Sequence, residues 1–206
     1  MLDPALLVIA KEPLPGRAKT RLCPPCTPEQ AASLAGCALR DTLAVVGRTP
    51  ARRRVLVFDG DGERWRPPGF ELIAQRGEDL AQRLACAFED VGGPALLVGM
   101  DTPQLTPDLL SAGLDALAQE GVDAVFGPTV DGGYWSAGLK TPLRSVFEGV
   151  PMSEPHTWAA QKARIRKLGL RLHEQPILRD VDTFADARIV ARQAPDSQFA
   201  RALATL

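Results

Sequence analysis

The sequence has little of what marks several large classes of protein. Its 24 lysines and arginines are balanced by 25 aspartates and glutamates, for a formal net charge of −1, so the basic excess typical of a nucleic-acid-binding domain is missing. No apolar run approaches the roughly 20 residues that a membrane-spanning helix needs. The apolar run at 5–10 is shorter than a signal-peptide core, and no basic stretch precedes it. We therefore expect a cytoplasmic protein with no DNA or RNA partner and no membrane contact.

Histidine and cysteine are also scarce, which argues against the common structural metal sites. The sequence has two histidines and four cysteines. Cys23 and Cys26 form a CxxC pair, but it lacks the second pair or nearby histidine that a zinc site would require. Two prolines separate these thiols, so we interpret the segment as a rigid turn; a redox-active pair is the distant alternative. Cys37 and Cys86 fall in helical patterns and are predicted to be buried.

What the chain does contain is a regular alternation of short apolar runs with helical patterns. Strands are expected at 5–10, 54–58, 70–74, 95–99, 123–127, 134–139 and 171–174, and helices at 27–46, 79–89, 106–120, 156–168 and 183–193. The run at 95–99 is apolar throughout, which predicts a central parallel strand. The alternation predicts a single α/β domain over 1–206, a three-layer α/β/α arrangement around a mostly parallel mixed sheet, with a short polar tail at about 195–206.

Two helix starts carry capping signals. Thr27 is followed by a proline and then by Gln30, which predicts a capping box with Thr27 as the N-cap. Thr106 precedes a proline in the same way and predicts the start of another helix.

The loop after the first strand, residues 11–22, is the richest candidate for a site, because ligands of such sheets bind beyond the carboxyl ends of the strands. Four cations, Lys11, Arg17, Lys19 and Arg21, lie within eleven residues. Gly16 lies among them and would let the backbone approach a phosphate closely. The Walker A pattern is absent. We interpret the segment as a phosphate-binding loop, with a solvated basic loop as the alternative.

Aspartates at the ends of later strands could hold a metal ion. Asp101 follows the most apolar run, where a carboxylate is costly to bury unless it is paired or metal-bound. Asp180 and Asp182 point the same way if the chain there is extended. Carboxylate oxygens suit Mg²⁺, so the basic loop and these acids resemble the parts of a magnesium–nucleotide site. The alternatives are that Asp101 caps a turn and that Asp182 or Thr183 caps the next helix.

The segment at 127–135 contains an aspartate, two glycines and two aromatic residues in succession. Asp131, Gly132 and Gly133 suggest a backbone that closes on a ligand, with Tyr134 or Trp135 lining the site. The alternative is a hairpin turn, because Asp-Gly is a strong hairpin signal.

Taken together, these segments resemble the DUF2064 group of transferases. The matching motifs are K-x-P-x-P-G-R-x-K-T-R-L at 11–22, V-G-x-D-x-P-x-L-T at 98–106, G-P-x-x-D-G-G-Y at 127–134 and D-V-D-T-x-x-D at 180–186. The resemblance runs from about 6 to 189 and implies the GT-A, or nucleotide-diphospho-sugar transferase, fold. The group is similar to 2-phospholactate guanylyltransferases. Met152 departs from the pattern, since many relatives have tryptophan there before the serine.

The resemblance also implies roles for individual residues. Nucleotide binding falls to Lys11, Gly16, Arg17, Lys19, Thr20 and Arg21. Mg²⁺, or Mn²⁺, would be held by Asp101 and Asp182, with Asp180 as the weaker alternative. Asp131, Gly132, Gly133 and Tyr134 would face the acceptor. The segment at 75–80 also matches the family, near where a base or acceptor could lie.

The function that we favour is nucleotidyl transfer from a nucleoside triphosphate to a small phosphorylated or hydroxyl acceptor, with release of pyrophosphate. Lys19, Arg17 and Asp101 are the expected catalytic residues, since such a reaction needs mainly alignment and charge neutralisation. Glycosyl transfer from a nucleotide sugar is the first alternative. It is disfavoured because metal-dependent glycosyltransferases usually have an Asp-x-Asp after a strand, whereas Asp101 is followed by Thr102 and Pro103, so the second aspartate is missing there. A non-catalytic nucleotide-binding protein is the second alternative. A homodimer is left open.

Overall fold

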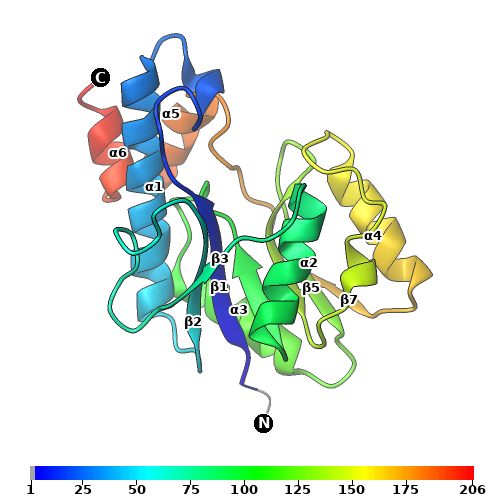
Figure 1. The fold of residues 1–206 in the computed structure, drawn as a ribbon. Coiled ribbons are helices and arrows are strands. Elements are labelled where there is room, and N and C mark those ends of the chain that lie inside the picture. Colours follow the sequence, from blue (N-terminus) through cyan, green and yellow to red (C-terminus); the bar gives the residue numbers. More distant parts are fainter. Residues whose placement is uncertain (1–2) are drawn as a thin grey trace.

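Seven strands form one sheet in the computed structural model, which describes residues 3–206 (Figure 1). Their order across the sheet is β3-β2-β1-β4-β6-β5-β7. The strands are β1 (Ala5–Lys11), β2 (Arg54–Asp59), β3 (Glu71–Ala74), β4 (Ala95–Val98), β5 (Ala124–Pro128), β6 (Tyr134–Leu139) and β7 (Leu172–Glu174). All seven expected strands are present, each within two residues of its predicted ends.

The sheet is parallel except at one strand. β6 runs antiparallel to both of its neighbours, β4 and β5, while the other four pairs are parallel. The mostly parallel mixed sheet is therefore confirmed. The expectation of a parallel strand at 95–99 holds only on the side of β1, because the hairpin that joins β5 to β6 reverses the chain before β6 pairs with β4.

Helices cover both faces of the sheet (Figure 1). The helices are α1 (Pro28–Arg48), α2 (Leu80–Val91), α3 (Pro107–Ala118), α4 (Thr157–Lys167), α5 (Phe184–Gln193) and α6 (Gln198–Leu203), with single 3₁₀ turns η1 (Thr20–Leu22) and η2 (Arg144–Val146). The side chains of α1 and α3 pack on one face, and those of α2 and α4 pack on the other. This confirms the three-layer arrangement.

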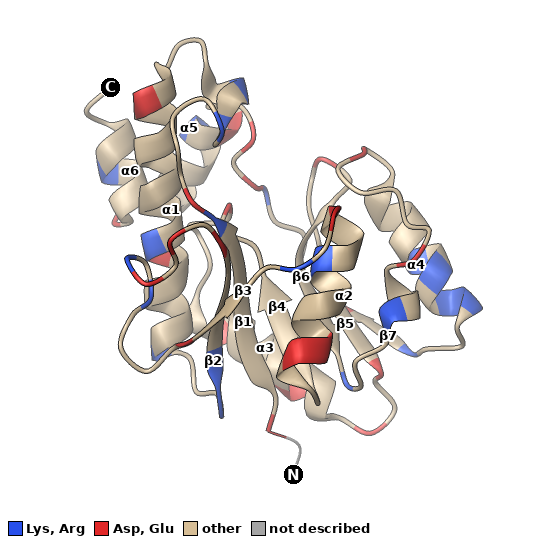
Figure 2. Ribbon diagram, viewed as in Figure 1, with Lys and Arg blue, Asp and Glu red and all other residues tan. Residues whose placement is uncertain are grey.

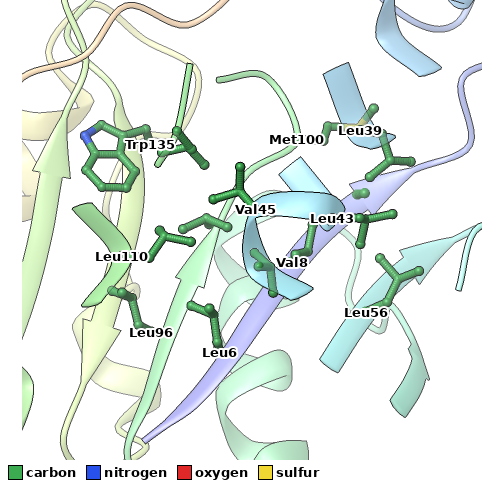
Figure 3. Packing of buried hydrophobic residues seen from close by; sticks show 14 of the residues in the cluster. Leu6, Val8, Leu39, Leu43, Val45, Leu56, Leu96, Met100, Leu110 and Trp135 are labelled. Carbon is green, nitrogen blue, oxygen red and sulfur yellow. The ribbon is translucent and has the colours of Figure 1, made fainter. Parts of the chain in front are cut away.

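The apolar runs of the central strands follow from this double cover. In β1, Leu6 and Val8 point into the cluster with Leu39 of α1, whereas Leu7 points into the opposite cluster with Phe88 of α2. Successive residues of a strand point to opposite faces, so a strand covered on both sides must be apolar throughout. Figure 3 shows the first of these clusters, with residues from β1, β2, β4, α1 and α3 in mutual contact.

The capping signals mark the helix starts correctly. Thr27 accepts from the backbone N–H of Gln30, and the side chain of Gln30 accepts from the N–H of Thr27, which completes the predicted capping box. Thr106 is the N-cap of α3. Thr183 forms a second capping box with Asp186 at the start of α5. Thr183, rather than Asp182, therefore caps this helix.

A third apolar cluster joins α1, α5 and α6 at one end of the sheet. The polar tail expected from about 195 contains α6, whose Phe199 is 1% exposed and packs in this cluster. Cys26 is buried there, and burial raises the pKa of its thiol, which keeps it protonated. Cys86 is buried as expected, but the prediction for Cys37 is wrong, since this residue is only half-buried. Among residues 3–206, no helix combines the length and apolarity needed to cross a membrane.

Candidate functional site

Five segments that are distant in the sequence line one cavity beyond the carboxyl ends of β1 and β4. Its volume is about 570 Å³. We call it the charged cavity, because four cations and five carboxylates line it: Lys11, Arg17, Lys19, Arg21, Asp101, Asp131, Glu154, Asp180 and Asp182. Thr20, Gly133, Ser153 and Pro155 complete its wall. Figure 2 shows acidic and basic residues together on the loops near the top of the sheet.

The loop after β1 is anchored at two points, which determines where its cations lie. Ala18 is 2% exposed and belongs to the core under α1, and Leu22 is fully buried in the cluster of α1, α5 and α6. Between these anchors Lys19 has a left-handed backbone, with φ 50°. Gly16 also has positive φ, 72°, but it is not part of the wall of the charged cavity. Arg17 is exposed at the mouth of the cavity.

Asp101 lies at the centre of the site, three residues beyond the end of β4. Its Oδ2 is 2.9 Å from the ammonium group of Lys19, whose side chain is 12% exposed. Its other oxygen, Oδ1, is buried and has no hydrogen-bond partner within the described chain. The neighbouring side-chain atoms Oγ1 of Thr102 and Oε1 of Gln104 are buried without partners as well. Unpaired buried polar atoms are costly, and of these three only the oxygen of Asp101 belongs to a residue that lines the charged cavity.

A short extended segment brings two more carboxylates to this cavity. The N–H of Val181 donates to the backbone oxygen of Asp101 at 2.9 Å, and the side chain of Val181 is buried on the side of α1. Asp180 and Asp182 therefore lie on the opposite side and line the charged cavity. Asp182 accepts from Arg21 at 2.5 Å. Burial, followed by repulsion from Asp131, raises the pKa of Asp180 to about 6, against an opposing effect of Lys19.

The segment at 129–133 is a hairpin turn between β5 and β6, so the hairpin alternative is confirmed. It still contributes to the cavity. Asp131 accepts from the hydroxyl of Thr129 at 2.5 Å and from the N–H of Gly133 at 3.0 Å, and Asp131 and Gly133 both line the wall. Gly132 instead lies against the next loop, because a Cβ on it would be 1.8 Å from the carbonyl oxygen of Pro155. Its role is close packing within the wall.

A second cavity of about 460 Å³ adjoins the first. We call it the apolar cavity, after the apolar side chains that line much of it: Ile9, Leu80, Leu84, Leu97, Met100, Tyr134 and Trp135. Lys11, Asp101 and Ser153 line both cavities and form the boundary between them. Tyr134, expected to face the acceptor, therefore lines the apolar cavity. Burial raises the pKa of its hydroxyl, which is 3.5 Å from Oε1 of Gln161.

Polar side chains at 75–83 close the far end of the apolar cavity. Gln75 donates from Nε2 to the backbone oxygen of Ala10 at 2.7 Å and accepts from Arg83 at 3.3 Å. Arg83 also forms an ion pair with Asp59 at 3.0 Å. In the sequence, only the resemblance to the family points to this segment, and that resemblance assigns no role to any single residue of it. Ser153 was missed altogether, because its signal is conformational: its φ of 61° is unusual for a residue other than glycine.

The same architecture is found in solved structures. A provisionally named nucleotide-diphospho-sugar transferase from Desulfovibrio desulfuricans G20 is 29% identical, with a TM-score of 0.86 over 99% of this chain and 94% of that one. Lower identities accompany CMP:2-keto-3-deoxy-manno-octonic acid synthetase complexed with CTP (13%, TM-score 0.60, covering 94% and 99% of the two chains). Rv0371c from Mycobacterium tuberculosis H37Rv, in complex with manganese, is 18% identical, with a TM-score of 0.58 over 93% and 98%. The chain thus has the fold of the nucleotide-diphospho-sugar transferases.

The family can be stated more narrowly. Residues 42–154 match DUF2064, described as an uncharacterized protein conserved in bacteria. This match spans more than half of the 206 residues, and the chain belongs to the DUF2064 family. A search of curated proteins found no match to the sequence.

Proposed function

We propose that this protein is a transferase that moves a nucleotidyl group from a nucleoside triphosphate to a small phosphorylated or hydroxyl acceptor, releasing pyrophosphate. The observation that carries the proposal is the junction of the two cavities at Lys11, Asp101 and Ser153. A nucleotide has one flat, weakly polar end and one polyanionic end. The apolar cavity suits the base and the charged cavity suits the phosphates, while the junction suits the reacting phosphorus.

The cations of the loop after β1 supply the charge that such a reaction needs. Lys11, Arg17, Lys19 and Arg21 line the charged cavity, and they would bind the triphosphate and neutralise the leaving pyrophosphate. Arginine presents a planar fork to phosphate oxygens, whereas lysine acts as a point charge. The attacking acceptor oxygen would approach from the hairpin side, past Asp131 and Gly133. The residues of the charged cavity would orient the reactants and neutralise charge, which is the main protein contribution to phosphoryl transfer.

A divalent cation fits the carboxylates of this cavity. Within residues 3–206, no group of three or more histidine, cysteine, aspartate or glutamate side chains is already arranged as a metal site. The unpaired, buried Oδ1 of Asp101 nevertheless provides one hard oxygen ligand. We propose that Asp101 and Asp182 hold Mg²⁺ or Mn²⁺, with Asp180 the alternative to Asp182. When bound, the ion would neutralise phosphate charge.

Glycosyl transfer from a nucleotide sugar is the second candidate. It is favoured by the name of the Desulfovibrio structure, which has 29% identity to this chain. It is disfavoured by Thr102 and Pro103, which follow Asp101 where an Asp-x-Asp would place its second carboxylate. The two candidates differ in which donor binds and in whether pyrophosphate is released.

A thermal-shift screen of nucleoside triphosphates and nucleotide sugars, each with and without Mg²⁺, separates the candidates. A ligand that binds the native state raises its melting temperature by mass action. We expect a Mg²⁺-dependent shift with a triphosphate, reduced in Arg17→Met and retained in Arg48→Met, a matched control at the exposed end of α1. A shift with nucleotide sugars alone would favour glycosyl transfer. No shift with either class would favour the non-catalytic alternative.

A further inference from the structure

The ion pair between Lys19 and Asp101 joins the two groups that the proposed function needs to be separate. Asp101 is the expected metal ligand, and Lys19 is the expected phosphate ligand. In the structure these two side chains form an ion pair with each other, with Nζ of Lys19 and Oδ2 of Asp101 2.9 Å apart. The other cations of the charged cavity are different: Arg21 pairs with Asp182 but is 74% exposed, and Lys11 and Arg17 form no ion pair with the described residues.

The surroundings hold Lys19 in this position. Its side chain is 12% exposed, and the buried residues Ala18 and Leu22 restrain the chain on either side. The left-handed backbone at Lys19, φ 50°, is unfavourable for a residue with a side chain. The burial of Ala18 and Leu22 keeps this backbone in place, so the ammonium group is directed to Asp101 rather than left free in solvent.

One ammonium group cannot serve a carboxylate and a phosphate equally well at the same time. While Lys19 is bound to Asp101, the carboxylate is largely neutralised and attracts a divalent cation weakly. When a phosphate takes Lys19, the charge of Asp101 is released, and its unpaired Oδ1 is already available. Phosphate binding and cation binding should therefore favour each other, and the coupling must be equal in both directions.

We propose that the Lys19–Asp101 ion pair makes metal binding conditional on the nucleotide: the free protein binds the divalent cation weakly, and binding of the triphosphate releases Asp101 to accept it. This inference rests on the proposed function for its physiological ligands. Its physical content, competition between Lys19 and a cation for Asp101, can be tested without any nucleotide.

The first test measures Mn²⁺ binding to the protein alone, from the electron paramagnetic resonance signal of free Mn²⁺. Lys19→Met should bind Mn²⁺ about tenfold more tightly than the wild type, the effect expected for loss of a partly buried ion pair. Lys19→Asn should behave alike, and asparagine tolerates the left-handed backbone. Arg17→Met is the matched control, because it removes one cation from the same cavity but breaks no ion pair; it should change Mn²⁺ affinity less than about threefold by general electrostatics.

The second test measures the reverse coupling with inorganic pyrophosphate, by calorimetry in buffer containing EDTA. Asp101→Asn should bind pyrophosphate several-fold more tightly than the wild type, because Lys19 is then free. Asp182→Asn is the matched control, and its effect should be smaller because its partner Arg21 is mostly solvated.

Two results would overturn the inference: equal Mn²⁺ affinity in the wild type and both Lys19 variants, or equal tightening by Arg17→Met and Lys19→Met. Neither result depends on nucleotide. A failure of triphosphates to stabilise the wild type would instead remove the proposed function, and the two titrations would still decide whether Lys19 competes with the cation.

Discussion

The two adjoining cavities differ in how their walls are built. The apolar cavity is lined largely by side chains that extend from the sheet and from α2, such as Leu97 and Leu84. The charged cavity is lined mostly by loops; its four cations come from residues 11–21 and its five carboxylates from residues 101–182. In the proposed function, the part of the site that would recognise the shape of the base therefore belongs to the packed core of sheet and helix. The part that would bind the charged phosphates lies on the loops.

Removal of the carboxylate at the junction should have the largest effect. In Asp101→Asn the site loses the negative charge and one of the two carboxylate oxygens of the group proposed to hold the cation, and we expect Mg²⁺-dependent turnover to fall by roughly 100-fold or more. Asp115→Asn, on the exposed face of α3, is the matched control and should retain activity. Thermal unfolding would show that both variants fold. Full activity in Asp101→Asn would contradict the proposal that Asp101 holds the cation.

A change in the wall shared by the two cavities should rank second. Gly132→Ala places a Cβ 1.8 Å from the carbonyl oxygen of Pro155, so the loop that contains Ser153 must move. We expect the KM values for both substrates to rise about tenfold, with a loss of stability of about 1–2 kcal/mol. Gly69→Ala is the matched control, since Gly69 has a similar φ, 81°, but no atom lies within 4 Å of its added Cβ. Equal effects of the two changes would show that backbone strain alone is responsible.

A larger side chain in the apolar cavity should weaken triphosphate binding there and leave cation binding in the charged cavity unchanged. No atom lies within 4 Å of a Cβ on Gly99, which lines the apolar cavity. Gly99→Leu should therefore fold, occupy space proposed for the base and raise the KM for the triphosphate about fivefold to tenfold. Mn²⁺ binding should stay unchanged, and Gly99→Ala should have little effect on either quantity. A loss of Mn²⁺ binding in the leucine variant would show that the two cavities are not independent.

The smallest effect is expected far from both cavities, at the edge of β5 and β7. Arg171 donates to Asp123 from its backbone and side chain, which holds the pKa of that carboxyl at about 2, below its ordinary value of 3.8. Because the folded pKa is depressed, the stabilisation is present above about pH 4 and is lost as the pH falls toward 2. We expect Asp123→Asn to reduce the free energy of unfolding by about 1 kcal/mol at pH 7.

Urea denaturation at several pH values checks this prediction. The difference between the wild type and Asp123→Asn should shrink toward zero near pH 2, while triphosphate binding at pH 7 stays the same in both. Asp115 is exposed and forms no ion pair with the described residues. Its variant Asp115→Asn should therefore show no such pH dependence. A constant difference across the pH range would contradict the assigned cause.

Much of the fold could be predicted because its signals are local. Seven strands and the five longer helices appear where the apolar periodicity indicated, and the capping boxes at Thr27 and Thr183 mark two helix starts. The errors have a common origin. The parallel pairing expected for the strand at 95–99 depends on where β6 inserts, and the burial of Cys37 depends on how far α5 and α6 cover α1. Neither fact is encoded in neighbouring residues.

In the candidate site, too, the local features could be predicted and the long-range contacts could not. Residue type and chain position alone are enough to tell which loops follow strands and which of them carry cations, carboxylates and glycines. Which of these charges meet depends on the tertiary structure. Arg21 and Asp182 are 161 positions apart, Lys19 and Asp101 meet because β1 and β4 are neighbouring strands, and Gly132 contacts Pro155 instead of the cavity. Such contacts depend on the order of the strands and the packing of the loops, which no local pattern specifies.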